Sequence, residues 1–207
     1  VREAQEAGVP EVVLTGVNLG AYDGKSAIDE HVEINELLEA IMERTSIPHV
    51  RISSVEPMDI SESLLKVMAR YPQRIAPFLH LPVQSGNDHI LKMMNRNYTR
   101  EKYLSQVATA RRYMPDIVIT TDIIVGFPNE TEEEFEDTIS LCEEVRFDAM
   151  FTFIYSKRTG TKAADMPDPT PRKEKTDRMT RLLKAQDDIA MALVKAQVGQ
   201  TVRVLCD

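Results

Sequence analysis

The stretch Ile117-Val-Ile-Thr-Thr-Asp-Ile-Ile-Val-Gly-Phe-Pro-Asn-Glu-Thr131 decides the fold. Its residues 117–125 are mostly β-branched or apolar, which favours a strand with both faces covered. Gly126-Phe127-Pro128 ends this strand, and Thr131 with Glu134 forms the capping-box pattern that begins a helix. The helix places apolar residues at helical spacing: Phe135, Ile139, Cys142 and Val145. The sequence therefore predicts a strand, a tight turn and a helix, which together form one β/α unit.

The same alternation of apolar strands and helical patterns continues on both sides of this unit. A helical pattern lies in each gap between strands, as in βα units on a parallel sheet. The predicted fold class is therefore α/β, with a parallel sheet in an open or partial-barrel form and helices outside. In either form, ligands bind at the C-terminal ends of the strands. The predicted strands are 11–15, 49–54, 78–83, 117–125 and 149–155.

The C-terminal part of the chain has a different character. We expect residues 1–160 to form the parallel α/β domain. Residues 161–197 contain a proline-rich linker and then a long helix with one mainly apolar stripe, and residues 198–207 begin a new β segment. The chain does not begin with methionine and stops inside a strand-like run, so we expect it to be an excised fragment.

Composition narrows the possible classes of protein. The chain has 207 residues, with 25 Lys and Arg against 33 Asp and Glu, a net charge of −8. No apolar run approaches the roughly 18 residues of a membrane span, so we expect no membrane contact. The two cysteines exclude a disulfide framework, and we expect a cytoplasmic protein. The basic stretch 157–184 indicates either a face that binds a polyanion or a solvated, salt-bridged helix.

Polar residues gather at the ends of the predicted strands, where a parallel sheet binds its ligands. Asn18, Glu56, Gln84 and Tyr155 each follow a strand, and together such groups suit a ligand with amino, carboxyl, ribose and base groups. Ordinary turn chemistry is the alternative. Asp122 stands inside an apolar strand, so it is either a ligand contact or a structural hydrogen-bond acceptor. We find no zinc-binding histidine pair, phosphate-binding P-loop or serine-hydrolase motif.

Four ordered motifs resemble those of the radical S-adenosylmethionine methylthiotransferases. They are His80-Leu-Pro-Val-Gln-Ser-Gly86, Met94-Asn-Arg-Asn-Tyr-Thr-Arg100, Thr120-Thr-Asp-Ile-Ile-Val-Gly-Phe-Pro-Asn-Glu-Thr131 and Tyr155-Ser-Lys-Arg-Thr-Gly-Thr161. In addition, residues 198–205 resemble the first strand of the family's TRAM domain, which binds RNA. The resemblance implies a partial βα barrel of radical SAM type, truncated before its cluster-binding loop and lacking its first βα unit.

The resemblance also implies an activity. The family cleaves S-adenosylmethionine at a four-iron four-sulfur cluster, and the resulting radical allows a methylthio group to be installed on a substrate carbon. The match favours the branch that modifies N6-isopentenyladenosine beside the tRNA anticodon. The alternatives are the branch acting on N6-threonylcarbamoyladenosine in tRNA and the branch acting on a ribosomal-protein aspartate. A reductant protein of the flavodoxin or ferredoxin type is the further partner implied.

Site residues carry over from the resemblance by position. Arg96 is expected to pair with the methionyl carboxylate, with a surface arginine as the alternative. Tyr155, Lys157 and Arg158 are expected where the nucleic acid enters. The expected cofactor-binding residues are Gly16, Asn18, Ser54, Glu56, Gln84, Ser85, Arg96, Asp122, Val125 and Gly126.

The sequence departs from the family at one point that matters for chemistry. The Cys-x-x-x-Cys-x-x-Cys loop that ligates the radical cluster is absent, and Cys142 and Cys206 cannot replace it. We therefore expect this fragment alone to be inactive, whereas its parent is an enzyme. The non-enzymatic alternative is an RNA-binding module whose parent has lost the cluster.

Overall fold

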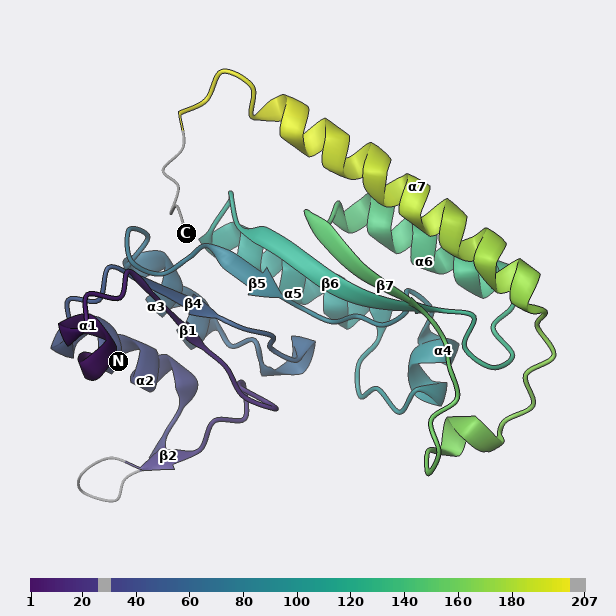
Figure 1. The fold of residues 1–207 in the computed structure, drawn as a ribbon, viewed down its shortest axis with the longest axis horizontal. Coiled ribbons are helices and arrows are strands. Elements are labelled where there is room, and N and C mark those ends of the chain that lie inside the picture. The colour runs from purple at the N-terminus through teal and green to yellow at the C-terminus, as the bar shows by residue number, and fades with distance from the viewer. Residues whose placement is uncertain (26–30, 202–207) are drawn as a thin grey trace.

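The computed structural model describes residues 1–25 and 31–201. Its main strands are all parallel and follow one another across the sheet in sequence order (Figure 1). An isolated parallel bridge from Ser54 to His80 joins the first two strands to the last three. The architecture is therefore the predicted α/β partial barrel. The strands in order are β1 (Glu11–Leu14), β4 (His49–Ile52), β5 (Phe78–His80), β6 (Val118–Val125) and β7 (Ala149–Ile154).

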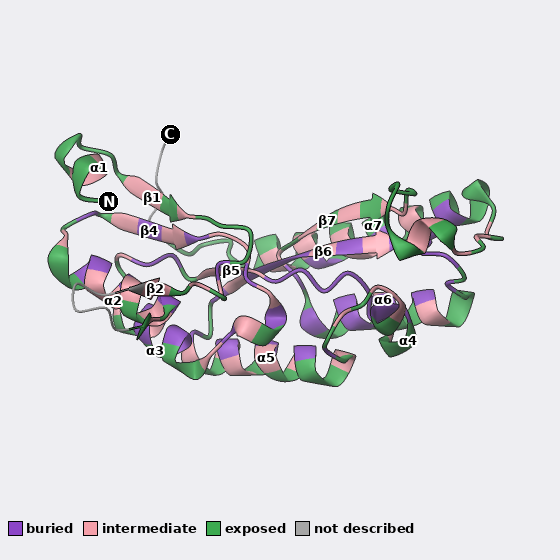
Figure 2. Ribbon diagram, turned by 90° about the horizontal axis from the view of Figure 1, so that it is seen from below, coloured by how far each residue is buried: buried purple, intermediate pink, exposed green. Residues whose placement is uncertain are grey.

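Helices cover one face of this sheet. Figure 2 shows α2, α3, α5 and α6 in one layer beneath the strands, and α7 lies along the β7 edge against α6 (Figure 1). On the other face of β5, β6 and β7, the described part of the chain places no α-helix. The helices are α1 (Arg2–Glu6), α2 (Ile34–Arg44), α3 (Glu62–Arg70), α4 (Asp88–Met93), α5 (Arg100–Tyr113), α6 (Glu132–Val145) and α7 (Arg172–Ala196), with short 3-10 turns η1 (Pro57–Asp59) and η2 (Lys162–Asp165).

The alternation of side chains along β6 separates the two faces. Ile119, Ile123 and Val125 are buried in the main hydrophobic core with the helices. Asp122 and Ile124 are only partly buried and belong to the opposite face, which forms the inside of the partial barrel. The sheet therefore has a sealed outer face and an open inner face.

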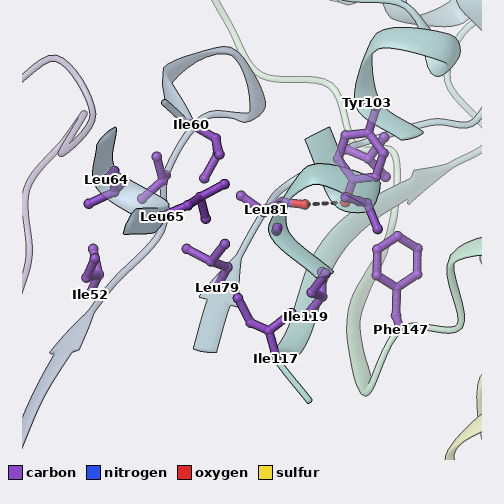
Figure 3. Packing of buried hydrophobic residues seen from close by; sticks show 14 of the residues in the cluster. Ile52, Ile60, Leu64, Leu65, Leu79, Leu81, Tyr103, Ile117, Ile119 and Phe147 are labelled. Atoms are coloured by element: carbon purple, nitrogen blue, oxygen red, sulfur yellow. Dashed lines mark hydrogen bonds between the residues drawn. The ribbon is translucent and has the colours of Figure 1, made fainter. Parts of the chain in front are cut away.

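The core lies between the strands and the helix layer. Figure 3 shows Leu79, Leu81 and Ile119 among the buried side chains, with Tyr103 of α5 pointing toward Leu81. The Tyr103 hydroxyl donates a hydrogen bond to the Leu81 carbonyl at 2.9 Å. Burial raises the pKa of Tyr103 far above the usual value, so the hydroxyl remains a donor. This bond ties α5 to the chain just after β5.

The structure confirms the predicted strands and adds one element. Each predicted strand contains the observed one, and Thr131 and Glu134 form the predicted capping box. The antiparallel pair β2 (Gly24–Lys25) and β3 (His31–Val32) was not predicted from the sequence. The second β domain predicted for 198–207 stays a prediction, because residues 202–207 lie outside the described residues. Among the described helices, none is both long and apolar enough to cross a membrane.

A buried ion pair fastens α7 to the turn after β6. The side chains of Arg178 and Glu130 are 2% and 1% exposed. Arg178 Nη1 donates to the Glu130 carbonyl at 2.9 Å and lies 3.3 Å from Glu130 Oε2, while its Nε donates to Glu132 at 3.1 Å. Glu130 Oε2 also accepts a hydrogen bond from the Gly126 N–H at 2.7 Å. The guanidinium of α7 thus satisfies the carboxylate that shapes the turn.

Removing this guanidinium tests its importance. Arg178→Ala is expected to lower the free energy of unfolding by about 3–5 kcal/mol, because Glu130 is left as a buried charge without a cation. The matched control is Arg181→Ala, whose side chain is 44% exposed and whose loss is expected to cost less than about 1 kcal/mol. Urea denaturation followed by circular dichroism measures both variants. Equal losses would contradict the role assigned to the buried pair.

Candidate functional site

A cavity of about 1170 Å³ opens at the C-terminal ends of β5, β6 and β7. Its floor comes from β6 and the chain after β5, and one wall comes from α4 and the residues that follow it. The opposite wall comes from β7, the chain after it and η2. The cavity therefore occupies the position in which parallel α/β sheets bind ligands. Of the sequence-predicted residues, it brings together Gln84, Arg96, Asp122, Tyr155 and Arg158.

Gln84 stands on the floor in an unusual backbone conformation. Its φ is +69°, in the left-handed region that non-glycine residues rarely occupy. Its backbone N–H donates to the Asp122 carbonyl at 2.8 Å, and its carbonyl accepts from the Ile124 N–H at 2.9 Å. Within the described residues, its side-chain amide has no hydrogen-bond partner. The amide is therefore held at the cavity with its donor and acceptor free for a ligand.

Asp122 has a partner, as a partly buried carboxylate requires. Its Oδ1 lies 3.4 Å from His80 Nε2, and the Asp122 side chain is 28% exposed. His80 Nδ1 lies 2.9 Å from Thr120 Oγ1, which holds the imidazole in place. Asp122 thus contacts His80 and also lines the cavity, where its contact with a ligand stays a prediction.

Arg96 lies on the α4 wall and contacts a second predicted residue. Its Nη1 lies 3.1 Å and 3.3 Å from the two carboxylate oxygens of Glu56, which follows β4. The Tyr98 hydroxyl anchors this segment by hydrogen bonds to the Pro82 and Val83 carbonyls at 3.1 and 3.2 Å. Burial raises the pKa of Tyr98 to about 12. Arg96 is therefore a held cation at the cavity, not an isolated surface arginine.

Three predicted cofactor residues face the protein interior. Ser85 is fully buried, and its hydroxyl lies 3.4 Å from Thr138 Oγ1 of α6 and accepts from the Asn87 N–H at 3.2 Å. Val125 is also fully buried. At Gly126, with φ +70°, an added Cβ would lie 2.6 Å from Lys175 Cδ. The side chains of Ser85 and Val125 therefore face the protein, and Lys175 occupies the space beside the Gly126 Cα, while the expected contacts of these three residues with the cofactor stay predictions.

The remaining predicted residues lie outside the cavity lining. Gly16 and Asn18 are exposed beyond β1, where the Asn18 side chain accepts from the Ala21 N–H at 3.3 Å. Ser54 is half-buried at the bridge to β5. Lys157 is exposed on the chain after β7. The described structure does not bring these four residues to the cavity.

Tyr155 closes the β7 side of the site. Its ring meets the edge of Phe127 at 5.2 Å between centroids, and Lys175 Nζ lies 5.7 Å from the ring centre. The hydroxyl is buried without a hydrogen-bond partner among the described residues. Burial, with the nearby Asp168 carboxylate, raises the pKa of Tyr155.

Sequence reasoning missed part of the lining. Phe153 of β7, Lys92 of α4 and Lys162 of η2 all face the cavity. The signal for Phe153 was present, because it alternates with Phe151 on a strand next to Asp122. The signal for Lys162 was the basic stretch 157–184, whereas Lys92 had no signal in the sequence, so only the three-dimensional arrangement reveals it.

Charge distinguishes the cavity from the rest of the chain. The net charge of the chain is −8, yet Lys92, Arg96, Arg158 and Lys162 line the cavity, and Asp122 is the only carboxylate among the described residues of its lining. Lys92, Arg158 and Lys162 have no ion-pair partner among the described residues. An anionic ligand therefore meets a locally positive surface.

The described residues provide no site for a metal cluster. No group of three or more His, Cys, Asp and Glu residues lies close enough among them to hold a metal ion. Cys142 is fully buried on α6, and burial raises its pKa to about 12, so it is a core thiol. Cys206 lies outside the described residues.

Comparison with known proteins identifies the family. The model for the Radical SAM superfamily matches residues 1–142. The chain belongs to this superfamily, which confirms the predicted fold class and implies S-adenosylmethionine and a four-iron four-sulfur cluster as cofactors. The residues of the cavity fit the first of these, through the free amide of Gln84 and the held cation Arg96, but the chain's cysteines do not fit the second.

Two relatives and two solved structures extend this finding. Proteins named tRNA-2-methylthio-N(6)-dimethylallyladenosine synthase, from Thermoanaerobacter sp. (strain X514) and Bdellovibrio bacteriovorus, are 44% and 39% identical over all 207 residues. The chain spans 43% and 45% of their lengths. Coproporphyrinogen III oxidase from Escherichia coli matches with 21% identity and a TM-score of 0.59, over 75% of this chain and 36% of that one. Methylornithine synthase matches with 14% identity and a TM-score of 0.52, over 73% and 42%. These two structural likenesses concern the fold.

A substitution of Gly126, which follows β6, tests whether the turn depends on the close contact with Lys175. Gly126→Ala is expected to destabilise the protein more than Gly160→Ala. Both positions have positive φ, but an added Cβ meets Lys175 at Gly126 and nothing within 4 Å at Gly160. The difference between the two variants is expected to be about 1–3 kcal/mol, since Lys175 is held by Asp168 at 2.6 and 2.8 Å and cannot easily yield. Urea denaturation measures it, and equal effects would show that Lys175 yields freely.

A substitution of Asp122, the carboxylate on the cavity floor, tests whether the cavity binds S-adenosylmethionine. Asp122→Asn in the full-length enzyme is expected to weaken S-adenosylmethionine binding about tenfold, because a charged hydrogen-bond acceptor becomes neutral without a change of shape. The matched control is Asp116→Asn, at an exposed position after α5. Isothermal titration calorimetry measures both. Unchanged affinity in the Asp122 variant would remove this residue from the cofactor site.

Proposed function

We propose that this chain is the S-adenosylmethionine-binding barrel of a tRNA methylthiotransferase. Its substrate in this proposal is N6-dimethylallyladenosine, also called N6-isopentenyladenosine, beside the anticodon, and its product is the 2-methylthio derivative. The observation that carries the proposal is the alignment of all 207 residues with enzymes named for that reaction. The unpaired cations around the cavity of an otherwise acidic chain add independent support.

The residues of this chain have binding and orienting roles in the proposal. Asp122 and Gln84 present an acceptor and an amide to the cofactor from the floor. Arg96, held by Glu56 at 3.1 Å, offers a guanidinium to the methionyl carboxylate. The superfamily takes from S-adenosylmethionine the radical that abstracts hydrogen from the substrate. The thiolates that ligate the cluster are not among this chain's residues.

Arg158, with Tyr155 and Lys157, is assigned to the entry of the tRNA. Arg158 lines the cavity, whereas Lys157 is exposed beside it. Unpaired cations there would neutralise phosphates and position the anticodon loop, while the cavity receives the base. Residues 198–207 would then begin the RNA-binding TRAM domain. A flavodoxin- or ferredoxin-type reductant and a cytoplasmic location complete the proposal.

Product analysis tests the proposed reaction. The full-length parent, with reconstituted clusters, reductant and S-adenosylmethionine, is incubated with tRNA that carries N6-dimethylallyladenosine. Mass spectrometry of digested nucleosides is expected to show the 2-methylthio derivative. The matched reaction uses tRNA with N6-threonylcarbamoyladenosine and is expected to show no product.

Two results would contradict the proposal. Methylthiolation of the threonylcarbamoyl nucleoside alone would assign the chain to the sister branch. Tight tRNA binding without turnover, by a parent that lacks the cluster cysteines, would make it an RNA-binding module.

A further inference from the structure

Two large aromatic side chains are exposed on the inner face of the sheet. Phe151 and Phe153 of β7 are 57% and 54% exposed. They alternate along β7, so they lie on one face, and their partners across the ladder on β6 are Asp122 and Ile124. Asp122, Ile124 and Phe153 all line the cavity. We call Phe151 and Phe153 the aromatic wall.

Nothing in the described fold accounts for the exposure of the aromatic wall. The intervening residues Met150 and Thr152 are half-buried, and Met150 packs against the main hydrophobic core. Phe151 makes one aromatic contact, with the edge of His80 at 5.6 Å between centroids. Two half-exposed phenylalanine side chains lack the hydrophobic stabilisation that burial in a core would give. A ligand that covers them would supply this stabilisation.

The cations around the wall indicate the kind of ligand. Arg158 and Lys162 follow the wall on the same side of the cavity, and Lys92 lies on the opposite side, in α4. None of the three has an ion-pair partner among the described residues. A flat apolar surface beside unpaired cations suits a nucleotide in a single-stranded loop, whose base stacks while its phosphates meet the cations.

We propose that the aromatic wall is the subsite for the substrate base. The adenine lies against Phe153, and its apolar N6 substituent reaches toward Phe151, deeper on the strand. This inference rests on the proposed function and adds the residues that recognise the substrate. An N6 substituent with a carboxylate would lie against an apolar surface next to Asp122 and is disfavoured there. The wall therefore selects for an apolar substituent.

Binding measurements with matched RNA loops test this subsite. The probes are three anticodon stem-loop RNAs of one sequence, in which the target base is adenosine, N6-dimethylallyladenosine or N6-threonylcarbamoyladenosine. Fluorescence anisotropy with the full-length holoenzyme gives each dissociation constant. The wild type is expected to prefer the dimethylallyl loop over the other two.

Variants of the wall are expected to lose this preference. Phe151→Ala and Phe153→Ala should each reduce it at least about fivefold, as for the loss of one base stack. Phe151→Leu and Phe153→Leu keep an apolar side chain without the flat ring, so folding is retained while stacking is lost. Met191→Ala on α7, at an equally exposed apolar residue (56%), is the matched control and should leave the preference unchanged. Affinity for S-adenosylmethionine should be unchanged in all variants.

The outcomes separate the subsite from the proposed function. If the wild type methylthiolates the tRNA but the wall variants keep its preference, the subsite proposal fails and the proposed function stands. If the wall variants lose S-adenosylmethionine affinity to the same degree as RNA preference, the wall belongs to the cofactor and the proposal also fails. If the wild type forms no product and prefers no loop, the proposed function fails first.

Discussion

The register of β6 is the constraint on which the rest of the structure depends. β6 bonds to β5 through Phe78↔Val118 to His80↔Thr120 and to β7 through Thr120↔Ala149 to Val125↔Ile154. Because side chains alternate, a slip of one residue would move Asp122 into the core and Ile123 into the cavity. The same register sets the positions of the turn at Gly126, of the start of α6 and of the site at which α7 packs against the sheet. Core, cavity and the attachment of α7 therefore depend on one strand.

Much of this architecture was predictable from local pattern. The β-branched run before Gly126 and the Thr131 capping box needed no tertiary information, and both are confirmed. Local pattern does not reveal contacts between segments that are distant in the sequence. Ser85 follows a strand and has the composition of a ligand contact, yet it is fully buried near Thr138, which is 53 residues away in sequence. Gly126 matched a cofactor segment, and the structure adds that a side chain at this position would meet Lys175.

The basic stretch 157–184 shows why charge counts alone left two alternatives open. On α7, Lys175, Arg178, Arg181 and Lys184 each have a carboxylate partner, so this part is the salt-bridged helix. Arg158 and Lys162, which precede α7, line the cavity without such partners. The salt-bridged helix describes the α7 part of the stretch, whereas binding of a polyanion by Arg158 and Lys162 stays a prediction. The difference arises from folding, which brings Glu130 and Glu132 to α7, while Arg158 and Lys162 have no ion-pair partner among the described residues.

The length of α7 sets a distance within the molecule. The helix has 25 residues, which correspond to roughly 37 Å. Its first turns are fastened near the cavity through Arg178 and Glu130, and Figure 1 shows the helix running from there back along the sheet edge to its far end. Leu182 and Ile189 are buried along the way, so the helix lies firmly on the body. α7 therefore fixes a distance: the chain that follows its last turn begins at a defined separation from the opening of the cavity. A polymer that touches both points must bridge that span.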